Sequence, residues 1–101
     1  QAYNAVLKSC FSAKQWKAAV ELVNKMESKR LPWNEFTEEA LVSGFSLNSR
    51  WEKAVEVFEK IRASRKPTEM MFTNVVAALE KAGNDRLAMK YYKMSVQELN
   101  L

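Results

Sequence analysis

The sequence predicts an all-α fold in which three antiparallel helix pairs stack into a solenoid. Three observations support this prediction. Apolar residues recur at helical spacing along the chain, and two anchor segments repeat in the same phase at intervals of 35 and 34 residues. The 101 residues include only two Gly and two Pro, which is too few turn formers for a many-stranded sandwich or barrel.

The repeat is visible in both halves of the unit. In the second half, Ala19, Ala54 and Ala88 are spaced 35 and 34 residues apart. They lie in three segments that align with one another: QWKAAVELVNKM (15–26), RWEKAVEVFEKI (50–61) and, more loosely, DRLAMKYYKM (85–94). The aligned segments of the first half are NAVLKSC (4–10), EALVSGF (39–45) and TNVVAAL (73–79). We therefore expect a single helical-repeat domain over residues 1–101, with repeats at about 1–34, 35–68 and 69–101.

Each unit divides into two helices at a polar break. The breaks are residues 12–15, residues 47–49 and residues 83–85, where Gly-Asn-Asp combines a helix stop with helix-starting residues. Pro32 and Pro67 cannot lie inside helices, so they mark the joints between units. The helices are expected at about residues 2–12, 15–29, 36–47, 50–64, 70–82 and 85–99.

The recurring alanine has a packing explanation. Two helices approach to about 8–10 Å when the contact residue is small, and Ala19, Ala54 and Ala88 suit that contact. Trp16 and Trp51 begin the second helices and are expected to cover the ends of their hairpins.

The composition argues against most kinds of enzyme active site. The chain has no His and one Cys, Cys10, so it lacks the commonest general base and cannot form a Cys/His zinc site. No glycine-rich phosphate loop is present, and no apolar run approaches the ~18 residues of a membrane span. The sequence predicts no enzyme, no metal site, no cofactor, no small-molecule substrate and no membrane partner.

The segment YNAVLKSCFSAKQWKAAVELVNKMESKRLP resembles a pentatricopeptide repeat. It has Tyr-Asn near the start of helix one, a small helix contact, Met closing helix two and a short basic joint with Pro. The tetratricopeptide repeat is the rival helix pair, but it places a small residue near the end of helix two, where this chain has Met26 and Ile61. The resemblance covers about residues 1–99 in three tandem repeats, and it implies a right-handed α-solenoid with the first helices on the concave side.

The resemblance also implies single-stranded RNA binding in mitochondria or chloroplasts, with one base read per repeat. In the first repeat the implied readers are Asn4 and Asn34, a pair that looks like a pyrimidine reader. The other implied RNA-binding residues are Gln1, which packs on the base in the first repeat; Glu39, Thr68 and Phe36 in the second; and Met70 and Thr73 in the third. Of the lysines that such repeats carry toward the end of helix one, Lys81 is in place.

The chain also departs from the pattern. Glu39 is an unusual reader, and its neighbour Glu38 replaces the aromatic residue found as Tyr3 and Phe72. The formal charge is +4, and residues 1–34 hold all of it as six Lys/Arg against two Glu. Most cations lie on second helices or joints, where they either form a solvated outer face or contact RNA phosphates or an acidic protein. The candidates for such contacts are Lys25, Lys29, Arg30, Arg65 and Lys66.

Two functions remain open. The chain is either an RNA-binding component of an organellar ribonucleoprotein, contacting a transcript or ribosomal RNA together with neighbouring proteins, or a protein–protein scaffold in an assembly such as a mitochondrial ribosome. Because stacked repeats normally need polar caps, we expect this stretch to be part of a longer array.

Overall fold

Six α-helices and no strands form the described part of the chain. The computed structural model describes the backbone of residues 2–99 and the side chains of residues 4–99, so Gln1 lies outside the described residues. The helices are α1 (Ala2–Ser12), α2 (Trp16–Ser28), α3 (Glu35–Leu47), α4 (Trp51–Ser64), α5 (Glu69–Lys81) and α6 (Asp85–Leu99). Each lies within one residue of its predicted bounds, which confirms the all-α prediction.

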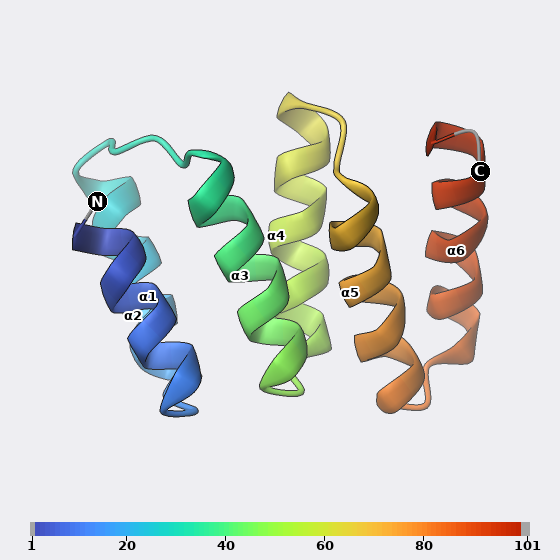
Figure 1. The fold of residues 1–101 in the computed structure, drawn as a ribbon, viewed down its shortest axis with the longest axis horizontal. Coiled ribbons are helices and arrows are strands. Elements are labelled where there is room, and N and C mark those ends of the chain that lie inside the picture. The colour runs from blue at the N-terminus through green and yellow to red at the C-terminus, as the bar shows by residue number, and fades with distance from the viewer. Residues whose placement is uncertain (1, 100–101) are drawn as a thin grey trace.

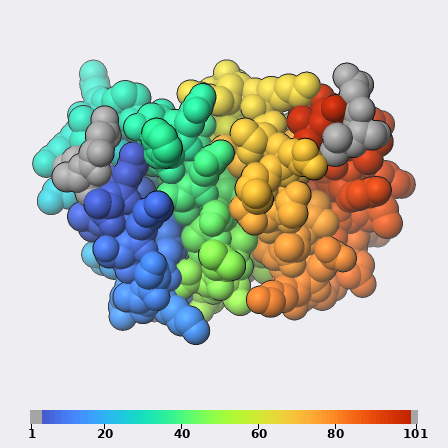
Figure 2. All heavy atoms as spheres, in the orientation of Figure 1, coloured from blue at the N-terminus to red at the C-terminus, as the bar shows by residue number. Residues whose placement is uncertain are grey.

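The helices form three antiparallel hairpins that stand in a row (Figure 1). Within each hairpin the two helices pack together, and the first helices α1, α3 and α5 also pack on one another in sequence. The hairpins therefore make two layers, with the first helices on one side of the molecule. Figure 2 shows that side, with α1 in blue, α3 in green and α5 in orange. The right-handedness of the superhelix stays a prediction.

The turn inside each hairpin uses the same backbone geometry. Lys14, Ser49 and Gly83 all have positive φ, at 60°, 60° and 78°, and they occupy the same place in the three repeats. The following residue donates its N–H to a carbonyl five residues earlier, as in Gln15 to Cys10 at 2.7 Å. These are the bonds of a Schellman-type helix end. Of these three residues only Gly83 is of a type that favours positive φ, so the sequence predicts this turn in the third repeat alone.

The joints between hairpins end in helix caps. Pro32 and Pro67 lie in the non-helical segments 31–34 and 65–68, as predicted. Asn34 caps α3 by accepting the Thr37 N–H at 2.9 Å, and Thr68 caps α5 by accepting the Met71 N–H at 3.2 Å. Such caps satisfy N–H groups that have no partner inside the helix.

The core runs through all three hairpins along the faces where the helices meet. Ala19, Ala54 and Ala88 are all buried there, which confirms their predicted placement. Trp16 and Trp51 are half-buried and pack against the core from the starts of their helices.

Enlarging Ala54 should overpack the middle hairpin. We expect Ala54→Leu to lower the free energy of unfolding by about 1–3 kcal/mol, because the added carbons have no space. Chemical denaturation measures this change. Ala63 is exposed near the end of the same helix, so Ala63→Leu should change stability by less than about 0.5 kcal/mol. Equal losses for the two variants would contradict the assigned packing.

Candidate nucleic-acid interface

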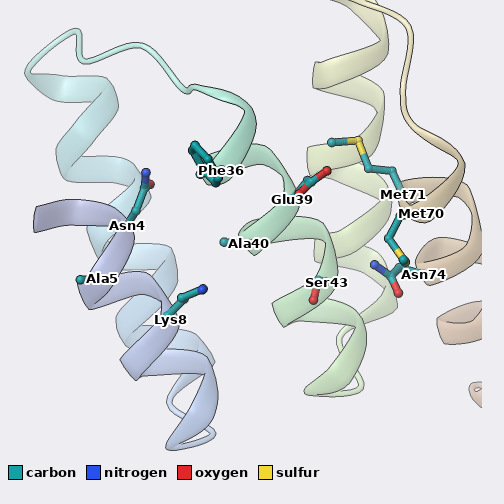
Figure 3. Close-up of a pocket in the computed structure, with 10 residues that line it drawn as sticks. All are labelled: Asn4, Ala5, Lys8, Phe36, Glu39, Ala40, Ser43, Met70, Met71 and Asn74. Atoms are coloured by element: carbon teal, nitrogen blue, oxygen red, sulfur yellow. The ribbon is translucent and has the colours of Figure 1, made fainter. Parts of the chain in front are cut away.

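The first helices together line an open groove with a volume of about 640 Å³ (Figure 3). Every residue that lines it comes from α1, α3 or α5: Asn4, Ala5, Lys8, Phe36, Glu39, Ala40, Ser43, Met70, Met71 and Asn74. Four of the residues implied to bind RNA, namely Asn4, Phe36, Glu39 and Met70, therefore share one surface.

Asn4 and Asn34 meet through the cap of α3. The Asn4 amide Nδ2 lies 3.4 Å from Asn34 Oδ1, although the residues are 30 positions apart. The hydroxyl oxygen of Thr37 lies 2.7 Å from Asn4 Oδ1 and 2.9 Å from Asn34 Oδ1. Thr37 is buried, so its hydroxyl contacts the two amides from the interior of the protein. The sequence analysis missed Thr37, whose only signal is its place three residues after a cap residue.

This network determines what the pair offers to a ligand. The backbone N–H of Thr37 fixes Asn34 Oδ1 as an acceptor, and the Asn4 amide must then present its Nδ2 to that oxygen. Asn4 Oδ1 in turn accepts from the Thr37 hydroxyl. Asn34 Oδ1 thus accepts two hydrogen bonds, whereas Asn4 Oδ1 keeps one lone pair, so the pair offers a ligand amide N–H donors and that one acceptor.

Two exposed apolar side chains flank Glu39 in the groove. Phe36 is 74% exposed and Met70 is 62% exposed, and both line the groove together with the exposed Glu39. Figure 3 shows Phe36 and Glu39 on α3 and Met70 on α5. The surface between α3 and α5 thus combines apolar area with one carboxylate acceptor.

The other predicted reader positions lie outside this groove. Thr68 is exposed, but its hydroxyl oxygen is engaged as the cap of α5. Thr73 donates to the Glu69 carbonyl at 3.0 Å and lines a separate pocket beside α6 with Tyr92. Lys81 is exposed in the last turn of α5. The structure does not bring these three residues together with Asn4 and Glu39.

Three polar groove residues were missed by the sequence analysis. Lys8, Ser43 and Asn74 line the groove, and each follows a predicted site residue by four positions. Residues four apart on a helix share a face. That spacing is the signal that would have found them.

Two protein-family models match the chain within residues 1–65. A model described as the PPR repeat family matches residues 1–47, and one described as the PPR repeat matches residues 40–65. The chain belongs to the pentatricopeptide repeat family. It is therefore a member of a helical-repeat family that binds RNA. No curated protein matches the chain.

Glu38 is the clearest departure from the pentatricopeptide repeat pattern. Its side chain is buried, and its Oε1 lies 3.5 Å from Arg65 Nη1 without a hydrogen-bond partner among the described residues. Burial raises the pKa of the Glu38 carboxyl, while Arg65 opposes that rise and Glu35 adds to it. Arg65 also lies 3.8 Å from Glu35. Arg65 thus holds the start of α3, in addition to any role with phosphate.

The remaining candidate cations of these pentatricopeptide repeats lie away from the groove. Lys25 is exposed in the last turn of α2, and Lys29, Arg30 and Lys66 are exposed in the joints. None of them lines the groove in the described part of the chain. Lys8 is the cation that does.

No group of three or more His, Cys, Asp or Glu in residues 2–99 is arranged to hold a metal ion. No helix in that range has the length and apolar character needed to cross a membrane.

Proposed function

We propose that the chain is a non-enzymatic RNA-binding segment of an organellar ribonucleoprotein, in mitochondria or chloroplasts. Its groove takes single-stranded RNA from a transcript or ribosomal RNA, and neighbouring proteins contact the rest of the solenoid. The observation that supports this most is the groove itself, where Asn4 of α1, paired with the α3 cap residue Asn34, and the exposed Phe36 of α3 lie on adjacent first helices.

The groove suits unstacked bases. Proteins that bind single strands place bases against aromatic side chains, at about 1–3 kcal/mol per base. Phe36 is exposed for such a contact, and Met70 offers a second apolar surface on the next helix. The base between these residues and the first repeat meets the amide donors of Asn4 and Asn34.

The donors of the first repeat favour a base with acceptors. Uracil has two carbonyl oxygens, and cytosine has a carbonyl oxygen and a ring nitrogen, so a pyrimidine edge accepts hydrogen bonds from both amides. A purine edge also carries acceptors, so the preference rests on the resemblance to pentatricopeptide repeats, in which this pair looks like a pyrimidine reader. We expect the first repeat to prefer pyrimidines.

A second candidate function is an interaction scaffold in a large organellar assembly such as a mitochondrial ribosome. The groove favours it in one respect, because Glu39 opposes phosphate and only Lys8 attracts it among the described groove residues. In that case the apolar groove residues contact a protein instead of bases.

Asn4→Ala should weaken RNA binding in a base-dependent way. The substitution removes a donor and leaves an acceptor of the base unpaired, which costs about 1–3 kcal/mol when the site is desolvated. We expect a pyrimidine oligonucleotide to lose most of its affinity and a purine oligonucleotide to change little. Fluorescence anisotropy at low salt measures both.

Asn74→Ala is the matched control, because Asn74 lies in the same groove without joining the Asn34 network. It should leave the preference between pyrimidine and purine unchanged. If wild type binds neither oligonucleotide at low salt, or if Asn4→Ala reduces both equally, the base-reading function fails and the scaffold function replaces it.

A further inference from the structure

The positive charge of the chain is concentrated on the second helices, turns and joints of the first two hairpins. Residues 13–34 and 48–68, which comprise α2, α4 and their flanking turns and joints, hold eleven Lys/Arg and five Glu, a net charge of +6. The rest of the chain holds five Lys/Arg and seven Asp/Glu, a net charge of −2. We call residues 13–34 and 48–68 the basic outer layer. Its charge is opposite in sign to that of the remainder, which includes all three first helices.

Most cations of the basic outer layer are exposed to solvent. Of its eleven Lys and Arg, only Lys53 and Arg62 are half-buried. Lys14, Lys25, Arg30 and Lys66 make no ion pair with any described residue. These four ammonium and guanidinium groups are therefore available to an external anion.

Tryptophan rings of the first hairpin and its joint contact cations of the second hairpin. Arg50, at the start of α4, lies 4.4 Å from the ring centre of Trp16 on α2, and Lys17 lies 5.7 Å from the same ring. At the other end, Lys60 of α4 lies 4.5 Å from the Trp33 ring and pairs with Glu27 of α2. Cations of α4 and its start therefore lie against α2 and the first joint at both ends of the helix pair.

The same contacts argue against single-stranded RNA on this surface. Single strands are held by stacking their bases on aromatic faces. Arg50 lies over the Trp16 ring and Lys60 over the Trp33 ring, and both rings are half-buried, so little aromatic face is left for a base. A double helix needs no such stacking, because its bases are internal and it presents phosphates and sugars.

The surface exposes few large apolar side chains to a protein partner. Stable protein interfaces have an apolar core surrounded by a polar rim. The large exposed hydrophobic side chains of the described residues lie on α1, α3, α5, α6 and the first joint, and none lies on α2 or α4. Leu31 is the single such residue within the basic outer layer.

We propose that the basic outer layer binds the phosphate backbone of double-helical RNA, independently of sequence and separately from the groove. A helix of 13 residues such as α2 is about 20 Å long, so cations at both of its ends reach phosphates along a duplex. Binding of this kind is dominated by counterion release and falls steeply with salt.

The test uses the 101-residue chain and two RNA hairpins with stems of about 16 base pairs and unrelated sequences. The variant Lys25→Gln/Arg30→Gln/Lys66→Gln removes three exposed cations that have no ion-pair partner among the described residues. We expect both hairpins to bind wild type alike and to lose affinity by about tenfold in this variant. The slope of log K against log salt is negative, and its magnitude, measured between about 50 and 200 mM, should be smaller by about 2 to 3 in this variant.

The control is Arg86→Gln/Lys90→Gln/Lys93→Gln, which removes three exposed cations from α6 and changes the net charge equally. It should alter hairpin affinity by less than about twofold. An equal loss in the two triple variants would show that net charge alone is responsible and would overturn the proposal, as would absence of hairpin binding at low salt. Tighter binding of a polyglutamate peptide than of either hairpin would assign the surface to an acidic protein instead. Asn4→Ala should leave hairpin binding unchanged, so the test of duplex binding is independent of base reading in the groove.

Discussion

Phe58→Ala is expected to lower the free energy of unfolding by about 3–5 kcal/mol, the typical cost of deleting a buried aromatic side chain. Phe58 is fully buried on α4, with its ring edge-on to Phe72 of α5 at 4.9 Å and to Tyr91 of α6 at 5.5 Å between ring centroids. Its removal leaves a cavity where the second and third hairpins meet. Because a stacked array is stabilised by contacts between neighbours, the loss acts on both hairpins. Urea denaturation followed by circular dichroism measures the change.

Phe36→Ala provides the same substitution at an exposed position. Phe36 is 74% exposed on α3, so the variant should change stability by no more than about 0.5 kcal/mol. If the two variants destabilised the protein equally, the packing of α4 against α5 and α6 would be wrong.

Gly44→Val should cost about 3 kcal/mol, at the upper end of the range for overpacked cores. A Cβ at Gly44 would lie 2.2 Å from Cδ2 and 2.3 Å from Cγ of Phe11, far inside contact distance. Phe11 also packs edge-on against Phe45 at 5.0 Å between ring centroids. The ring therefore has no easy way to move aside. Thermal unfolding of wild type and variant measures the loss.

A second substitution separates this clash from an effect of valine on the helix. In a Phe11→Ala background, Gly44→Val should cost much less than it does alone, because the ring that it meets is absent. Ala77→Val, at an exposed position of α5, should cost only the few tenths of a kcal/mol expected from helix propensity. Additive losses for Gly44 and Phe11 would rule out the close approach of α1 and α3.

The helices and hairpins could be predicted because their signals are local. Apolar spacing, the polar breaks and the two prolines placed all six helices to within one residue. The alanine repeat predicted where paired helices approach, and Ala19, Ala54 and Ala88 are all buried. These features depend on neighbours within a single hairpin, so a sequence of one repeat contains most of the information.

The turns and one tight contact were not predictable in this way. Lys14 and Ser49 adopt the same left-handed conformation as Gly83, although neither residue type favours it. They do so because the two packed helices of each hairpin stand at a similar separation, and the turn that joins them must span it. Gly44 likewise gave no local signal, since its role depends on Phe11, 33 positions earlier in another hairpin.

The groove shows the same division between local and long-range information. The resemblance to pentatricopeptide repeats placed Asn4 with Asn34, and their side chains meet at 3.4 Å; their role in reading a base stays a prediction. It did not indicate Thr37 or its contacts with both amide oxygens, because that network forms across the joint between two hairpins. It also grouped Thr73 with the readers, whereas the structure places it in a pocket beside α6.

The sequence by itself determined the helices, the hairpins, the repeat family and the excess of cations on second helices and joints. Each of these follows from residue type and spacing within about 35 residues. The tertiary structure alone decided which polar groups face the groove, which cations are paired and which remain open to an anion. The physical reason is that rotation and register between stacked hairpins arise from packing of side chains such as Phe11 on Gly44 and Phe58 on Phe72. Small changes in that packing move a side chain from one face to another, and no local pattern records them.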